Sequence, residues 1–149
     1  MKRPVTPQDF DAVLFDLDGV LTTTRTVHAA AWKRTFDEFL GAWDAERGST
    51  SAPFDERSDY ATYLDGKPRQ DGVRDFLASR GIELPESGPD SPSQEESVWG
   101  VGNRKQLLVE DELERTGVEV FPGSVAWVRE LRWAGLKTAV VSNRLAIPA

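Results

Sequence analysis

Residues 11–22 read Asp-Ala-Val-Leu-Phe-Asp-Leu-Asp-Gly-Val-Leu-Thr. The apolar run at the start of this stretch is short and lacks polar alternation, which is typical of a parallel strand covered on both faces. Asp16 and Asp18 follow where the strand ends, and Gly19 permits a tight bend directly beyond them. In open α/β sheets, ligands bind at the carboxyl ends of the strands. The two carboxylates therefore predict a site at this edge of the sheet.

The rest of the chain alternates helical patterns with loops and ends in a second buried strand, residues 136–142. The pattern predicts helices over residues 29–40, 57–64, 71–79, 103–115 (capped by Asn103) and 124–135 (capped by Ser124), with loops at 41–53 and 85–97. We expect the serine- and proline-rich loop at 85–97 to be exposed and mobile. The order of these strands and helices along the chain predicts an α/β core from residues 1–22 and 118–149, interrupted by a helical cap from residues 23–117.

Composition limits the class of protein. The chain has 149 residues, about one domain, and a formal net charge of -7, which disfavours a nucleic-acid partner. No apolar run approaches the roughly 18 to 20 residues of a membrane helix, so no membrane role is expected. There is no cysteine, and no apolar segment follows the basic N-terminal residues as in a secretory signal. These features predict a cytoplasmic protein.

The paired acids need a partner. Two neighbouring carboxylates repel each other unless a cation lies between them or one of them is protonated, and Mg²⁺ is the cation that would serve phosphoryl transfer. A solvated acidic turn after the strand would show the same two residues, and that alternative stays open on spacing alone. A calcium-binding EF-hand loop is excluded, because Gly19 and Val27 do not stand where that loop needs its glycine and last acidic ligand.

The stretch from Asp16 to Thr22 resembles the first motif of the haloacid-dehalogenase-like superfamily, and the chain resembles its β-phosphoglucomutase-like sugar phosphatases and mutases in particular. Further matching stretches lie at His28 with residues 31–33, at residues 66–69 and at residues 100–105. The resemblance covers nearly the whole chain. It implies a partial Rossmann-like parallel sheet with an inserted helical cap, Mg²⁺ as cofactor and a small phosphorylated sugar as substrate.

The resemblance also implies roles for residues near the first strand. Asp16 would be the nucleophile that becomes an aspartyl phosphate, and a Mg²⁺ ligand. Asp18 would be the general acid and base, with its backbone carbonyl on the metal. Thr24 and His28 match positions near the mouth of the site, and His28 is linked there to the placement of Asp18.

Three further residues match substrate-binding positions of that family. Arg69 matches the cap arginine that binds the distal phosphate, a role suited to a guanidinium group. Ser142 matches the hydroxyl that binds the transferring phosphoryl group, and the amide of Asn143 could assist it. Each has a simpler interpretation: Arg69 as a solvated loop cation, Ser142 as a strand cap, and His28 as a partly buried helix residue.

Two other features favour structural roles. Trp32 lies on an apolar stripe, so a core position is expected for it. Residues 100–102 read Gly-Val-Gly but lack both the third glycine and the preceding strand of a dinucleotide-binding loop.

The chain departs from the family pattern after the second strand. The family's third motif, a lysine, and its fourth, an acidic pair, are absent from the 149 residues, so we expect a chain truncated after the second motif. Thr23 stands where close relatives often carry an acid, and Asp65 where they often carry a lysine. Three hypotheses remain: an aspartyl-phosphate enzyme, an inactive truncated remnant that only binds a phosphosugar or a partner, and a chain whose missing strands come from a second polypeptide.

Overall fold

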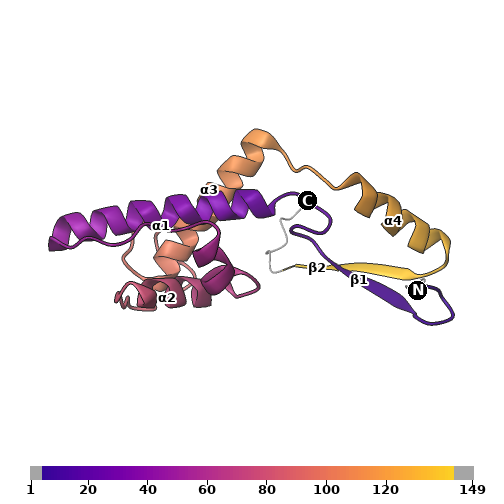
Figure 1. Cartoon of the computed structure of the whole chain (residues 1–149), viewed down its shortest axis with the longest axis horizontal. Helices are drawn as coiled ribbons and strands as arrows, with labels where there is room; N and C mark the ends of the chain where they lie inside the picture. The colour runs from indigo at the N-terminus through magenta and orange to yellow at the C-terminus, as the bar shows by residue number, and fades with distance from the viewer. Residues whose placement is uncertain (1–4, 143–149) are drawn as a thin grey trace. The chain divides into compact units, whose positions relative to one another are not determined.

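The computed structural model describes residues 5–142 and divides the chain into two compact units (Figure 1). The first unit comprises Met1–Arg25 and Val118–Ala149, and the second comprises Thr26–Gly117. In chain order the elements are β1 (Ala12–Asp16), α1 (Arg25–Arg47), the π-helical turn η1 (Tyr60–Leu64), α2 (Arg69–Ser79), α3 (Val98–Thr116), α4 (Pro122–Trp133) and β2 (Lys137–Val141). None of the described helices combines the length and apolarity needed to span a bilayer.

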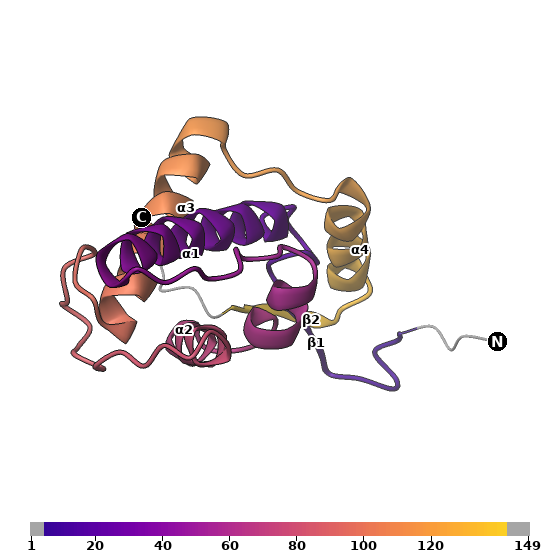
Figure 2. The ribbon, with the colours of Figure 1, turned by 60° about the vertical axis from the view of Figure 1, so that its left-hand side comes forward.

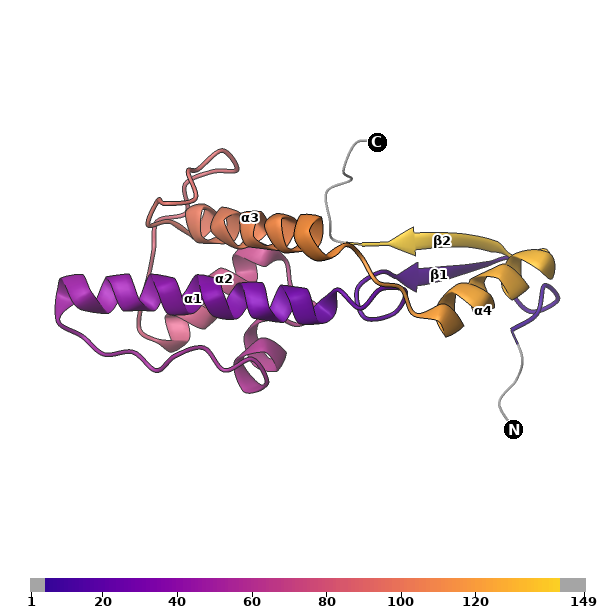
Figure 3. The ribbon, with the colours of Figure 1, turned by 90° about the horizontal axis from the view of Figure 1, so that it is seen from above.

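A parallel two-stranded sheet forms the centre of the first unit. β1 and β2 pair in register from Ala12 with Lys137 to Asp16 with Val141, and α4 lies along one side of the pair (Figure 3). Phe15, Leu131 and Leu136 form its buried core. The strands predicted from the two apolar runs are confirmed, and the α/β class with them. α4 begins at Pro122, not at Ser124, because the fixed φ of proline suits the first helical position.

The second unit consists of α1, α2 and α3 with their connections (Figure 2), and its core is largely aromatic. Phe36 is fully buried, with its ring centroid 4.0 Å from that of Phe76 and 5.4 Å from that of Phe54. Trp32 stacks on Phe36 and is only 5% exposed, so the core position expected for it is confirmed. Burial of several large rings in one cluster accounts for the cohesion of this unit.

Helix α1 is longer than its sequence pattern predicts. The loop expected at residues 41–53 is wrong over its first part, because α1 continues to Arg47. Trp43 packs against the core, and the Arg47 guanidinium lies 3.5 Å from the centroid of its ring. Tertiary contact thus extends the helix through Gly41, whose helix propensity is poor.

The serine- and proline-rich segment, residues 85–97, is bound to α3 along its length. Its outer side is exposed, but Asn103 Nδ2 donates to the carbonyl oxygens of Pro89 (3.0 Å) and Ser91 (2.9 Å), and Arg104 Nε donates to that of Ser93 (3.0 Å). The cap of α3 is Ser97, whose hydroxyl accepts from Gly100 N at 3.0 Å. The prediction that Asn103 caps this helix is therefore wrong.

Candidate functional site

The carboxyl edge of the sheet gathers the acids and the serine predicted from sequence. β1 ends at Asp16, which pairs with Val141, and Ser142 follows directly after β2. Asp16 is exposed, and its Oδ1 accepts a hydrogen bond of 2.8 Å from Leu17 N. The register of the two strands therefore brings Asp16 and Ser142 to the same end of the sheet.

A tight turn after β1 folds the chain back toward Asp18. Gly19 has φ +79°, a conformation that side-chain-bearing residues rarely adopt, and its N–H donates to Thr22 O at 2.8 Å. The N–H groups of Leu21 and Thr22 both donate to Leu17 O at 3.0 Å. These bonds return the backbone so that Thr24 meets the second acid.

Two buried threonines hold the Asp18 carboxylate. Thr24, only 1% exposed, donates its hydroxyl hydrogen to Asp18 Oδ1. The Thr22 hydroxyl lies 2.8 Å from that of Thr24 and 3.1 Å from Leu17 O. Each hydroxyl carries one hydrogen, and Thr24 gives its hydrogen to Asp18, so the hydrogen of Thr22 is shared between the Thr24 hydroxyl and Leu17 O. The carboxylate of Asp18 is thus fixed in orientation by a chain of side-chain hydrogen bonds.

In the second unit, His28 of α1 meets Lys105 of α3. Lys105 Nζ lies 2.7 Å from His28 Nδ1 and 5.2 Å from the centroid of the Trp32 ring, and the lysine is 5% exposed. An ammonium group can only donate, so Nδ1 accepts and the imidazole proton lies on Nε2. A buried cation is therefore compensated by an imidazole nitrogen and an aromatic face.

Arg69 is the first residue of α2 and packs on the backbone of α3. Its side chain is half-buried, Nη1 lies 3.4 Å from Gly102 O, and desolvation by burial lowers the pKa of the guanidinium while Glu110 opposes the shift. A Cβ at position 102 would lie 3.1 Å from Arg69 Cδ. The interpretation of Arg69 as a solvated loop cation is wrong, because the residue is helical and partly desolvated.

Gly100 and Gly102 of α3 allow neighbouring segments to pack closely against the helix. A Cβ at Gly100 would lie 2.3 Å from Glu95 O, so the serine- and proline-rich segment can dock only where no side chain is present. This contact, together with the one between Gly102 and Arg69, gives the Gly-Val-Gly sequence a packing role inside a helix.

The candidate residues divide between the two units. Asp16, Asp18, Thr24 and Ser142 belong to the first unit, and His28 and Arg69 belong to the second. Asn143 lies outside the described residues.

Sequence reasoning assigned no role to Thr22 or Lys105. The burial of Lys105 could have been predicted from the sequence, because Lys105 falls on the same helical stripe as the buried residues Val98, Val101 and Val109. The burial of Thr22 was harder to predict, since a threonine at this position would also suit an exposed turn.

The donor chemistry at the carboxyl edge suits Mg²⁺ in part. Mg²⁺ takes oxygen ligands and is usually held by one or two carboxylates, with waters and phosphate oxygens completing the shell. Asp16 and Asp18 supply carboxylate and carbonyl oxygens of this kind. Among residues 5–142, no group of three or more acidic, histidine or cysteine side chains is arranged to hold a metal ion.

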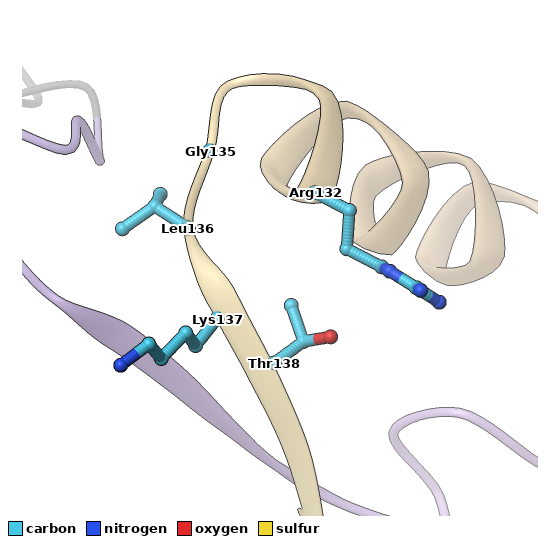
Figure 4. Close-up of a pocket in the computed structure, with 5 residues that line it drawn as sticks. All are labelled: Arg132, Gly135, Leu136, Lys137 and Thr138. Carbon is cyan, nitrogen blue, oxygen red and sulfur yellow. The ribbon is translucent and has the colours of Figure 1, made fainter.

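A shallow hollow of about 440 Å³ lies at the opposite end of β2 (Figure 4). It is lined by Arg132, Gly135, Leu136, Lys137 and Thr138. Figure 4 shows the Arg132 and Lys137 side chains extending away from each other. Because its two cations diverge and it is remote from the strand ends that carry the acids, we do not assign a ligand site to it.

Comparison with known proteins places these residues in a family. The profile of the haloacid dehalogenase-like hydrolases matches residues 10–149. A β-phosphoglucomutase of Mycobacterium tuberculosis is 47% identical over 137 residues, which cover 92% of this chain and 52% of that protein. An uncharacterised glycosyl hydrolase of the same species is 38% identical over 132 residues, 87% of this chain and 9% of its own length. The chain thus spans about half the length of the mutase that it matches.

Solved structures share the fold at lower identity. A hydrolase from Pseudomonas syringae superposes with a TM-score of 0.63 and 18% identity, covering 91% of this chain and 51% of its own. An archaeal β-phosphoglucomutase from Pyrococcus gives a TM-score of 0.59 and 24% identity, with 88% and 51% covered. The structural likeness shows a shared fold, and the family profile matches nearly the whole sequence, so the chain belongs to the haloacid dehalogenase-like hydrolase family.

Proposed function

We propose that the chain contributes the nucleophile and the general acid and base of a sugar-phosphate phosphatase or phosphomutase. The observation that carries the proposal is the pairing of Asp16 with Val141, because it brings a carboxylate and the hydroxyl-bearing Ser142 to one end of a parallel sheet. That edge is where ligands of such sheets bind. The 47% identity to a β-phosphoglucomutase supports a phosphorylated sugar as the substrate class.

In the proposed reaction, a carboxylate oxygen of Asp16 attacks the phosphorus atom of the substrate and forms an aspartyl phosphate. The bond from phosphorus to the sugar oxygen breaks, and the leaving oxygen takes a proton from Asp18. Transfer to water, with the proton returned to Asp18, completes a phosphatase cycle, and transfer to a second sugar hydroxyl completes a mutase cycle. Both outcomes use the same two aspartates.

Other residues assist binding and orientation. Thr24 holds one oxygen of Asp18 and so orients the carboxyl group for proton transfer. The Ser142 hydroxyl donates to the transferring phosphoryl group, and the Arg69 guanidinium of the second unit is suited to bind a phosphate group. Mg²⁺, when bound by Asp16 and the Asp18 carbonyl, supplies charge compensation for the phosphoryl oxygens.

The test is a phosphatase and mutase assay on an aryl phosphate and a panel of sugar phosphates, with Mg²⁺ or with a chelator. Turnover that requires Mg²⁺ and disappears in Asp16→Asn is expected, together with a covalent phosphoryl adduct on Asp16 detected by mass spectrometry. Equal background in the wild-type and Asp16→Asn preparations would refute catalysis by this chain.

A second candidate function is binding of a phosphorylated sugar without turnover. It is favoured by the donor set, since no group of three or more acidic, histidine or cysteine side chains among residues 5–142 is arranged to hold a metal ion. Saturable binding of a sugar phosphate that is weakened by Arg69→Gln, in a preparation without turnover, would support this alternative.

A further inference from the structure

Thr22 is buried where the turn after β1 closes, with only 6% of its surface exposed. Its main chain is held from within the turn, because its N–H donates to Leu17 O at 3.0 Å and its carbonyl oxygen accepts from Gly19 N at 2.8 Å. The residue also forms isolated backbone bridges with Asp18 and with Val120. The backbone therefore fixes the place from which the Thr22 side chain starts.

The Thr22 hydroxyl connects the turn to the side chain that holds the second acid. Its Oγ1 lies 3.1 Å from Leu17 O and 2.8 Å from Thr24 Oγ1. Thr24 in turn donates to Asp18 Oδ1. A buried hydroxyl is costly unless it is hydrogen-bonded, and here both threonines have partners. The hydrogen bonds thus run from the backbone of the turn through Thr22 and Thr24 to the carboxylate, all within the first unit.

The direction of the Thr24 hydrogen depends on both neighbours of its hydroxyl. A hydroxyl hydrogen rotates about the Cβ–Oγ bond to suit its surroundings, so one acceptor alone holds it less firmly than an acceptor and a donor together. Thr22 supplies a donor on one side of the Thr24 oxygen, and Asp18 Oδ1 is the acceptor on the other. A valine in place of Thr22 would have a similar shape but would supply no donor.

We propose that Thr22 is a positioning residue for Asp18 and acts through Thr24. Its hydroxyl keeps Thr24 oriented as a donor, and Thr24 then holds the Asp18 carboxyl group in one orientation. The effect of Thr22 on rate rests on the function proposed above, in which Asp18 exchanges a proton with the substrate. Its effect on the Thr24 hydroxyl does not. A hydrogen bond between neutral groups contributes less than one to a charged group, so the loss at Thr22 should be smaller than the loss at Thr24.

The first experiment needs no turnover and measures, by NMR on the full chain, how fast the Thr24 hydroxyl proton exchanges with water. Thr24 is 1% exposed, so exchange should be slow in the wild type. Thr22→Val should speed it by about three- to tenfold, because one hydrogen bond to this hydroxyl is lost, and Thr22→Ser should keep it slow. Thr35→Val is the matched control, since Thr35 is fully buried in α1 and its hydroxyl donates to Ala31 O at 2.7 Å.

The second experiment measures kcat and KM of the same variants on a sugar phosphate. Thr22→Val should lower kcat by about three- to tenfold with KM little changed, and Thr22→Ser should restore kcat. The double variant Thr22→Val with Thr24→Val should be no slower than Thr24→Val alone, because Thr22 acts through Thr24 and the two effects are not additive. Thr35→Val also loses a buried hydroxyl, and it should leave kcat unchanged because Thr35 lies in the second unit.

Two results would overturn the proposal. One is a Thr24 hydroxyl proton that exchanges equally fast in the wild type and in Thr22→Val, or that Thr35→Val accelerates to the same extent. The other, in a preparation with turnover, is a kcat that Thr22→Val leaves unchanged or that falls further when Thr22→Val is added to Thr24→Val. A chain without turnover in which only Thr22→Val speeds the exchange would contradict catalysis by this chain and still support the positioning of Thr24 by Thr22.

Discussion

Single residues set the geometry of the carboxyl edge. Gly19 allows the turn, and the turn lets a threonine six residues after Asp18 fix the carboxylate. The two aspartates are visible in the sequence as a short local pattern. Their hydrogen-bonding partner is not, because which polar residue meets Asp18 depends on how the backbone bends after Gly19.

Removing the Thr24 hydroxyl should slow catalysis under the proposed mechanism. Thr24→Val keeps the shape of the side chain but deletes the hydrogen bond to Asp18 Oδ1. A hydrogen bond to a charged group contributes about 1.5 to 3 kcal/mol, so kcat should fall by roughly one to two powers of ten with KM little changed. Thr24→Ser should restore kcat, and an unchanged kcat in Thr24→Val would remove the threonine from the mechanism.

Two glycine-to-alanine substitutions should have opposite effects on stability. Gly100→Ala would place a Cβ 2.3 Å from Glu95 O and should lower the free energy of unfolding by about 1 to 3 kcal/mol through overpacking. Gly41→Ala, inside α1 with no atom within 4 Å of the new Cβ, should raise it by about 0.5 to 1 kcal/mol. Urea denaturation of both variants measures the difference, and equal effects would contradict the close contact at Gly100.

At the scale of elements, sequence periodicity predicts those segments whose partners are local. Both strands and the core stripe of α1 follow from apolar spacing. The extension of α1 to Arg47 does not, because it depends on Trp43 packing against a core assembled from other elements. Phe54 is buried at 1% in a segment with no helical or strand pattern, so its place in the core could not be predicted either.

The cap of α3 provides a test at this scale. Ser97→Ala removes the hydroxyl that accepts from Gly100 N and should lower the free energy of unfolding by about 1 kcal/mol. Ser124→Ala is the matched control, since Ser124 lies inside α4 and not at its N-cap. It should change stability by less than about 0.5 kcal/mol. Chemical denaturation of both variants measures their free energies of unfolding. A larger loss of stability in Ser124→Ala than in Ser97→Ala would contradict the assigned caps.

The end of α1 predicts a dependence on pH. Asp44 accepts hydrogen bonds from the Ser49 hydroxyl (2.6 Å) and from Ser51 N (2.7 Å), which hold the pKa of its carboxyl below the ordinary value against opposing desolvation. A carboxyl pKa that is lower in the folded state stabilises the fold above the unfolded pKa, and this contribution is lost as pH falls through the folded pKa. Asp44→Asn should therefore show a shallower loss of stability between neutral and acidic pH, and an unchanged slope would contradict the assignment.

The whole molecule consists of two units with separate and unequal cores. The second unit buries a cluster of aromatic and aliphatic side chains, whereas the buried core of the first comprises Phe15, Leu131 and Leu136. A core this small is marginal when one sheet face stays exposed. The division into two units could be predicted from the sequence, because most of the helical patterns lie between the two strands. The stability of each core could not, because it depends on side-chain packing that only the structure shows.

Unfolding should therefore occur in two steps. The first unit contains Trp127, whose ring lies edge-to-face with that of Phe15, and the fluorescence change of Trp127 should come at lower temperature or denaturant than that of the second unit. Phe36→Ala should lower the stability of the later step by about 3 to 5 kcal/mol and leave the earlier one nearly unchanged. Trp127→Phe and Trp133→Phe together assign the first signal, and a single coincident transition for all probes would contradict independent cores.

Helix α3 has two positions without side chains, and each receives a different neighbour. The serine- and proline-rich segment rests at Gly100, and Arg69 rests at Gly102. Libraries that randomise α3 should keep both glycines fixed. Length changes in residues 85–97 offer a way to move the Arg69 side chain indirectly, by shifting helix α3, against which that side chain packs.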